Sequence, residues 1–225
     1  MREVVLDTET TGLDPAEGHR IVEIGCVELR NLVPTGRTYQ TYLNPERDMP
    51  PQAFAVHGLS ESFLAGHPVF AAVVDDLLGF LGDGRLVIHN AEFDLRFLNA
   101  ELGRLGRPAV PPSSALDTLQ LARRKHPGAP ASLDALCRRY GVDTSERGQH
   151  GALLDARLLA EVYLHLKGGR QPSLVLAGPG PVAPAQSPAR PPRTPRPARP
   201  HAPSEAEAAA HAAFIDALTK PIWRR

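Results

Sequence analysis

The chain has 225 residues, and its 25 basic and 25 acidic side chains balance to a formal net charge of zero. Its two cysteines exclude a disulfide-rich scaffold and a cysteine-based metal site, and we expect both thiols to be reduced and buried. No apolar run approaches the roughly 18 residues that a membrane span needs, and no apolar signal region precedes the first expected strand, so we expect a cytoplasmic protein without a membrane anchor.

Apolar periodicity predicts five strands and five helices between residues 3 and 167. The strands are expected at 3–7, 20–29, 37–43, 85–89 and 114–117, and the helices at 69–81, 92–105, 117–125, 132–140 and 151–167. Three successive early strands indicate an antiparallel meander, and the later alternation of strand and helix indicates parallel additions. The pattern predicts one α/β core with a five-stranded mixed sheet flanked by helices.

The first expected strand leads into two acids, in Val4-Val5-Leu6-Asp7-Thr8-Glu9. A short apolar run bounded by charge is typical of a central strand buried on both faces. Side chains two residues apart share a face of a strand, so Asp7 and Glu9 are expected side by side. Two like charges this close need a positive partner, and a divalent metal ion is the usual one.

Two further acids lie on the apolar stripes of predicted helices. Asp94 is in helical register with Phe97 and Leu98, and Asp155 is in register with Leu158 and Leu159. An ionised carboxylate in an apolar setting costs several kcal/mol unless it is paired. We therefore expect both acids to join the metal site, with two buried arginine ion pairs as the alternative.

His150 precedes Asp155 by five residues, which would place the two on different faces of one helix. We expect His150 in the loop just before the helix that carries Asp155. From there its imidazole could take a proton from a metal-activated water near neutral pH. The alternative is an ordinary solvated histidine.

These residues together resemble the DEDDh family of 3′→5′ exonucleases. The resemblance rests on Asp7-Thr8-Glu9, on His89-Asn90-Ala91-Glu92-Phe93-Asp94, and on His150 with Asp155, in this order across roughly the first 168 residues. Ser132-Leu133-Asp134-Ala135-Leu136-Cys137 with His150-Gly151-Ala152-Leu153-Leu154-Asp155-Ala156 is similar to the proofreading epsilon subunits of bacterial DNA polymerase III. The resemblance implies a ribonuclease H-like fold and release of nucleoside 5′-monophosphates.

The resemblance also implies roles for single residues. Asp7, Glu9 and Asp155 would hold one Mg²⁺ or Mn²⁺, Asp7 would bridge to a second ion that Asp94 supports, and His150 would be the general base. Gln52 and His57 would lie near the terminal nucleotide. The alternatives are an ordinary surface role for Gln52 and a turn-capping role for His57 before Gly58, while His89 could end a strand and Asn90 could cap the Asp94 helix.

The core is expected to end at residue 168, where the composition changes. Residues 169–203 are predicted to be a flexible linker, because 179–203 hold ten of the 23 prolines together with arginines that could touch DNA. Within it, Gln171, Leu174 and Leu176 in the segment 171–176 resemble a peptide that binds a sliding clamp. The alternative is residual packing of this segment on the core.

Residues 204–225 are expected to form a second ordered segment. Ser204 and Glu207 form a capping-box pattern, and Phe214 and Leu218 then share one helical face before Trp223. The segment resembles the part of epsilon subunits that docks on the alpha subunit of the polymerase. The alternative is that it folds back on the core.

The leading hypothesis is a proofreading subunit of replicative DNA polymerase III that removes mispaired 3′ nucleotides from DNA. Its expected partners are a single-stranded or frayed DNA 3′ end, the alpha subunit and the sliding clamp, with a small third core subunit left open. The alternatives are a free-standing DEDDh ribonuclease or oligonucleotide exonuclease, and a non-enzymatic tether with a dead nuclease fold. The last would lack one of the acids, and all four are present.

Overall fold

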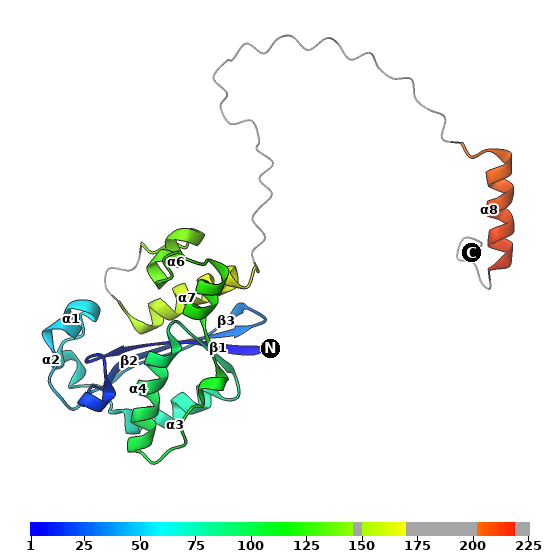
Figure 1. Ribbon diagram of the computed structural model, residues 1–225. Helices are drawn as coiled ribbons and strands as arrows, with labels where there is room; N and C mark the ends of the chain where they lie inside the picture. Colours follow the sequence, from blue (N-terminus) through cyan, green and yellow to red (C-terminus); the bar gives the residue numbers. More distant parts are fainter. Residues whose placement is uncertain (146–149, 170–201, 219–225) are drawn as a thin grey trace, which may run out of the picture. The chain divides into compact units, whose positions relative to one another are not determined.

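Five strands form one mixed sheet in the order β3-β2-β1-β4-β5 (Figure 1). Strand β1 pairs antiparallel with β2, which pairs antiparallel with β3, while β4 runs parallel to β1 and β5 runs parallel to β4. The strands are β1 Arg2–Thr10, β2 Ile21–Arg30, β3 Val33–Tyr42, β4 Arg85–Ile88 and β5 Ala115–Asp117. The predicted meander with parallel additions is confirmed, and β1 lies at the centre of the sheet.

The structure, a computed structural model, describes residues 1–145, 150–169 and 202–218. The chain divides into a larger unit that carries the sheet and a second unit that carries the last helix. The α-helices are α1 Pro51–His57, α2 Glu61–Leu64, α3 Phe70–Leu81, α4 Ala91–Arg104, α5 Thr118–Lys125, α6 Leu133–Tyr140, α7 Ala152–Leu166 and α8 Glu205–Ala217. Two short 3₁₀ helices cover Pro15–Glu17 and Pro112–Ser114.

Helices cover both faces of the sheet (Figure 1). On one face, Val4 and Leu6 of β1 pack against α3 and α4. On the other face, Val5 packs against α7, whose outer side contacts α5 and α6. Alternate residues of β1 therefore face different helices, as the period of two along a strand requires. Both faces of the central strand are buried, as its apolar sequence predicts.

The structure differs from the sequence-based expectation at two places near the site. Strand β1 extends to Thr10, so Asp7 and Glu9 lie within it rather than after it. Its pairing with β2 continues as far as Thr10 opposite Ile21, with an irregularity just after Glu9. Helices α1 and α2 were not predicted, because their short segments have no apolar stripe long enough to indicate a helix.

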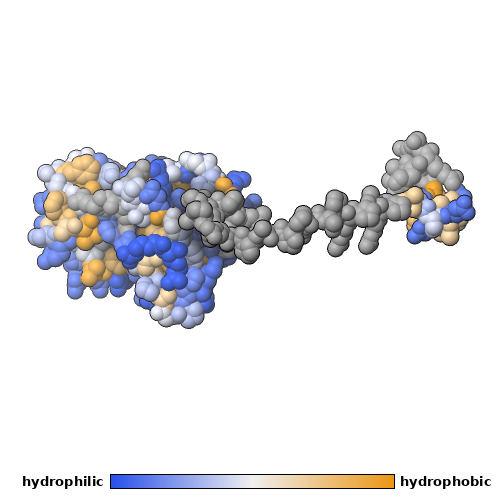
Figure 2. All heavy atoms as spheres, turned by 90° about the horizontal axis from the view of Figure 1, so that it is seen from above, coloured by the Kyte–Doolittle hydropathy of each residue, from blue (hydrophilic) through white to orange (hydrophobic). Residues whose placement is uncertain are grey.

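The described part of the second unit, residues 202–218, contains α8. Ser204 and Glu207 form the predicted capping box, in which each side chain bonds the other residue's backbone N–H. Phe214 is 61% exposed and Leu218 is 37% exposed. In Figure 2 this helix presents hydrophobic residues next to hydrophilic ones. None of the helices in the described ranges is long and apolar enough to cross a membrane.

Candidate active site

Strand β1 carries two acids on the sheet face that α7 covers. Asp7 and Glu9 follow Val5 at intervals of two residues, and Val5 belongs to the cluster that packs against α7. Glu9 is buried, whereas Asp7 has intermediate exposure. In the β1–β2 ladder, Asp7 lies opposite Gly25 and Glu9 lies opposite Glu23. The two acids are therefore neighbours on one face, as the strand period predicts.

Helix α4 brings a third acid from the other face of the sheet. Asp94 is 3% exposed, and its Oδ1 accepts a hydrogen bond of 2.8 Å from Oγ1 of Thr8. Burial raises the pKa of Asp94 to about 7, and the Thr8 hydrogen bond offsets part of the rise. The predicted inward orientation of Asp94 is confirmed, and no arginine forms an ion pair with it among the described residues.

The start of α4 differs in part from its predicted cap. Asn90 holds the N-cap position, but it adopts the left-handed conformation with φ 66° and makes no side-chain capping bond. Its backbone N–H instead donates to Oδ1 of Asp117 over 3.2 Å. His89 follows the end of β4, and its Nδ1 lies 2.9 Å from Oγ1 of Thr118. The position of Asn90 was predicted correctly, but its capping bond was not.

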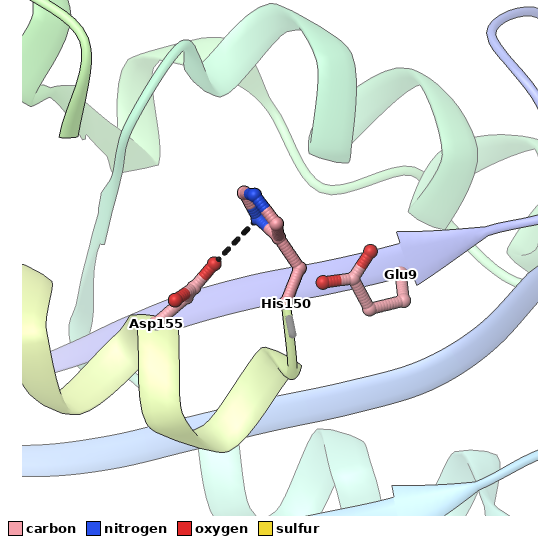
Figure 3. A group of neighbouring side chains, drawn as sticks. All are labelled: Glu9, His150 and Asp155. Carbon is pink, nitrogen blue, oxygen red and sulfur yellow. Dashed lines mark hydrogen bonds and ion pairs between the residues drawn. The ribbon is translucent and has the colours of Figure 1, made fainter. Parts of the chain in front are cut away.

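Helix α7 supplies the fourth acid, and the residue before its N-cap supplies the histidine. Asp155 is 4% exposed, and its Oδ2 lies 3.1 Å from Nδ1 of His150 (Figure 3). The side chain of His150 is 46% exposed. Potential ligand atoms of Glu9, His150 and Asp155 all lie within 4.8 Å of one another. The expected loop position of His150, before an inward-facing Asp155, is confirmed.

Burial and the crowding of acids together shape the electrostatics of the site. The pKa of Asp7 is raised well above its ordinary value, first by burial and then by the charges of Asp94, Glu9 and Asp155. A bound cation would relieve this repulsion. Carboxylate oxygens are the ligands that Mg²⁺ and Mn²⁺ prefer, so this set of donors from β1, α4 and α7 fits a divalent metal.

A cleft of about 470 Å³ opens beside these acids. Thr8 to Leu13 line one side of it, and α1 lines another with Gln52 and His57. Gln52 is exposed, whereas His57 is only 4% exposed. The backbone N–H of His150 also points to α1, where it donates to the Val56 carbonyl over 3.3 Å. The cleft thus brings Gln52 and His57 to the same cavity as Glu9, whereas their contact with a nucleotide stays a prediction.

His57 also has a structural partner. It is the last residue of α1, and its Nδ1 accepts a hydrogen bond of 3.0 Å from the backbone N–H of Leu59. Gly58 between them has φ 71°, the left-handed conformation that glycine tolerates best. Burial lowers the pKa of His57, and the Thr10 backbone offsets part of that change. This hydrogen bond directly supports the alternative role of His57, which is to cap the turn after α1.

Sequence analysis missed one acid beside the site. Glu23 of β2 is 2% exposed, and its charge contributes to the raised pKa of Asp7. Its carboxylate accepts a hydrogen bond from the backbone N–H of Ala152 at the start of α7. An acid inside the apolar segment Ile21-Val22-Glu23-Ile24 was the available signal.

The expected partner-binding residues are described only in part. Gln171, Leu174, Leu176 and Trp223 lie outside the described residues. Phe214 is exposed on α8, but Leu218 follows the end of the helix in an extended conformation, so the expectation that the two share one helical face was wrong. Their roles in partner binding stay predictions.

Comparison with known proteins gives matches along most of the chain. A family model described as exonuclease, RNase_T, matches residues 4–163. A DNA polymerase III subunit epsilon from Rickettsia felis is 56% identical over 174 residues, covering 76% of each chain. The protein of the same name from Salmonella typhimurium is 45% identical over 238 aligned positions, covering 99% of this chain and 97% of the relative.

Solved structures agree with the sheet topology. Exonuclease X in complex with 5′ overhanging duplex DNA matches with a TM-score of 0.58 and 28% identity, over 73% of this chain and 90% of the other. The nuclease domain of 3′hExo, a DEDDh family member bound to rAMP, matches with a TM-score of 0.64 over 74% of this chain and 92% of the other. At 19% identity the second match supports the fold alone.

Proposed function

This chain belongs to the family of DNA polymerase III epsilon subunits, and from that premise we propose that it removes mispaired 3′ nucleotides from DNA as a proofreading subunit. It is a 3′→5′ exonuclease. The observation that carries the proposal is the convergence of Asp7, Glu9, Asp94 and Asp155 around the end of β1, next to His150. Such a set of carboxylates beside a histidine suits metal-assisted hydrolysis of a phosphodiester.

The carboxylates would hold divalent metal, Mg²⁺ or Mn²⁺. Asp7, Glu9 and Asp155 would bind one ion, and Asp7 would bridge to a second ion supported by Asp94. Two such ions would activate the attacking water and stabilise the leaving 3′ oxygen. Burial and then the neighbouring carboxylates raise the pKa of Asp7, and this supports the assignment because a bound cation would stabilise the ionised carboxylates.

His150 would accept the proton of the attacking water. With its Nδ1 directed at Asp155, the imidazole would keep one orientation and accept the proton on Nε2. The carboxylate of Asp155 would also stabilise the imidazolium that forms. The 46% exposure of the side chain gives it a route to pass that proton to solvent.

The cleft beside the acids would hold the terminal nucleotide. Gln52 and His57 line it from α1, and Phe93 of α4 adds an apolar ring to the same cleft. A base can enter only after it leaves its stack, and a mispaired base does so at lower cost. Preference for single-stranded or mismatched 3′ ends follows from that difference.

One assay tests the proposal directly. The full chain is incubated with single-stranded DNA, matched and mismatched primer-templates, and RNA of the same sequence, each with Mg²⁺ and then with chelator. We expect release of nucleoside 5′-monophosphates from DNA, faster from mismatched than from matched ends, and none with chelator. Activity that survives the chelator, or faster hydrolysis of RNA than of DNA, would contradict the proposal and favour a free-standing ribonuclease.

The remaining chain would bring this site to the replication fork in the cytoplasm. We propose a core at 1–168, a linker at 169–203 and a docking segment at 204–225, in which Phe214, Leu218 and Trp223 would contact the polymerase alpha subunit. Gln171, Leu174 and Leu176 would contact the sliding clamp, and a small third subunit could join the same assembly.

Two variants separate these contacts. Deleting 204–225 is expected to abolish binding to the alpha subunit while hydrolysis of single-stranded DNA is retained. Replacing Gln171, Leu174 and Leu176 with alanine is expected to weaken clamp binding alone. Clamp binding equal to that of the parent chain would eliminate the clamp assignment.

A further inference from the structure

Helix α7 begins without a side-chain cap of its own. Its N-cap is Gly151, which has no side chain to accept from the first backbone N–H groups of the helix. The N–H of Ala152 instead donates 3.0 Å to Oε2 of Glu23, which comes from β2. The helix that carries Asp155 is thus capped by a side chain from the central sheet.

Burying a carboxylate at position 23 is energetically unfavourable. Glu23 lies directly opposite Glu9 in the β1–β2 ladder, and like charges at such positions repel each other. It is 2% exposed, and within the described ranges no lysine or arginine forms an ion pair with it. What the two hydrogen bonds of Glu23 require is a side chain of this length with an oxygen acceptor at its end, and the charge itself adds only repulsion.

Glu23 is not arranged as a further metal ligand. Its Oε1 accepts 2.8 Å from Nε2 of Gln40, and its Oε2 accepts from Ala152. Both carboxylate oxygens of Glu23 therefore already accept hydrogen bonds from N–H donors. In the part of the chain that the structure describes, Glu23 also does not belong to the group of Glu9, His150 and Asp155 whose potential ligand atoms lie close together. The geometry identifies an anchor for α7.

Gly25 gives α7 the room to reach this anchor. It shares a face of β2 with Glu23, two residues away. A Cβ atom at Gly25 would lie 2.2 Å from the carbonyl carbon of Ala152 and 2.2 Å from the nitrogen of Leu153. The first turn of α7 thus lies directly on the backbone of β2.

We infer that Glu23 is a positioning residue for the exonuclease reaction, fixing the first turn of α7 so that His150 and Asp155 meet Glu9. His150 lies two residues before the anchored Ala152, and Asp155 closes the first turn through its N–H to the Gly151 carbonyl, 2.8 Å. A shift of that turn displaces the histidine and the acid together. The inference rests on the proposed function, in which these two residues take part in hydrolysis.

Two substitutions separate the length of Glu23 from its charge. Glu23→Gln keeps the length and one acceptor oxygen, so we expect its kcat on single-stranded DNA to stay within about threefold of the parent chain. Glu23→Asp keeps the charge but shortens the side chain, so we expect kcat to fall about tenfold or more with KM nearly unchanged. Both retain a polar group at a buried polar site, which favours folding of both variants.

Glu3→Ala is the matched control for a loss of packing on α7. Glu3 is also a buried acid of the central sheet that bonds α7, because its Oε1 accepts 2.7 Å from the Tyr163 hydroxyl. That contact lies near the other end of the helix. We expect this variant to lower the melting temperature without changing kcat.

Mn²⁺ binding measured by calorimetry provides a readout besides turnover. We expect Glu23→Asp to weaken it about tenfold, and Glu23→Gln and Glu3→Ala to leave it close to that of the parent chain. A Gln variant as impaired as the Asp variant, or an equal loss of kcat in Glu3→Ala, would overturn the inference. An inactive parent chain would contradict the proposed function instead, while the pattern of Mn²⁺ affinities would still test the anchor.

Discussion

Helices α4 and α7 each deliver one acid to β1, but from opposite faces and with different neighbours. Asp94 on α4 is held by the Thr8 hydroxyl in a buried setting. Asp155 on α7 is equally buried, yet its partner is a histidine whose side chain is 46% exposed. The α4 side therefore holds the Asp94 carboxylate in place, whereas the α7 side joins the Asp155 carboxylate to an imidazole that solvent can reach. We therefore propose that proton transfer takes place on the α7 side.

Of the substitutions that compare the α4 and α7 sides of β1, replacing Asp155 on α7 should have the largest effect on activity. We expect Asp155→Asn to lower kcat/KM by about 10³-fold or more, since a metal ion contributes several kcal/mol to such a transition state. Mn²⁺ binding should weaken in parallel. Glu161→Gln, an exposed acid on the same helix, is the matched control. Near-normal Mn²⁺ binding by Asp155→Asn would remove Asp155 from the ligands.

The histidine should affect turnover without affecting the metal. We expect His150→Ala to lower kcat by about 10²-fold or more, the usual contribution of a general base, while DNA binding stays largely intact. Because His150 lies close to Glu9 and Asp155, it could instead be a ligand. A matching loss of Mn²⁺ affinity would identify it as one.

On the α4 side, the Thr8 hydroxyl should act through Asp94. Thr8→Val removes the hydrogen bond that lowers the pKa of this carboxyl. We expect kcat to fall about tenfold and the acid limb of the pH–rate profile to move to higher pH. Thr8→Ser should restore both. A change of rate with an unmoved pH profile would mean that Thr8 does not act through the ionisation of Asp94.

The raised pKa of Asp94 links stability and metal affinity to pH. A carboxyl whose pKa rises to about 7 on folding is protonated more readily in the folded chain. Without metal, the buried Asp94 carboxyl does not destabilise the folded chain below its ordinary pKa. The free energy of unfolding then falls as the pH rises from about 4 to about 7, and it stays level above that. Metal binding displaces the proton, so Mg²⁺ affinity should be about tenfold weaker at pH 6 than at pH 8.

Melting temperature measured against pH, with and without Mg²⁺, tests this linkage. Asp94→Asn should flatten the metal-free dependence between pH 4 and 7, whereas Glu92→Gln, an exposed acid on α4, should not. Equal Mg²⁺ stabilisation at pH 6 and pH 8 would contradict the assignment of the pKa to a metal site.

Sequence alone predicted the sheet and the orientation of the four acids, because strand and helix periods fix which way a side chain points. It missed α1, whose buried residue is the polar His57 and whose Phe54 and Val56 are 45% and 48% exposed. Periodicity of apolar residues cannot find such a helix. It also missed Glu23, since the backbone group that this acid caps lies 129 positions further along the chain. The chemical roles of the acids and the histidine stay predictions for the variants above.

The contacts around β1 span very different stretches of chain. Thr8 meets Asp94 across 86 positions, whereas Glu23 meets Ala152 across 129 and Glu3 meets Tyr163 across 160. During synthesis from the amino end, β1 emerges first and α7 last among the elements that build the site. A chain interrupted before α7 carries neither His150 nor Asp155. Because both residues are proposed to act in hydrolysis, we expect such an unfinished chain to be inactive on DNA.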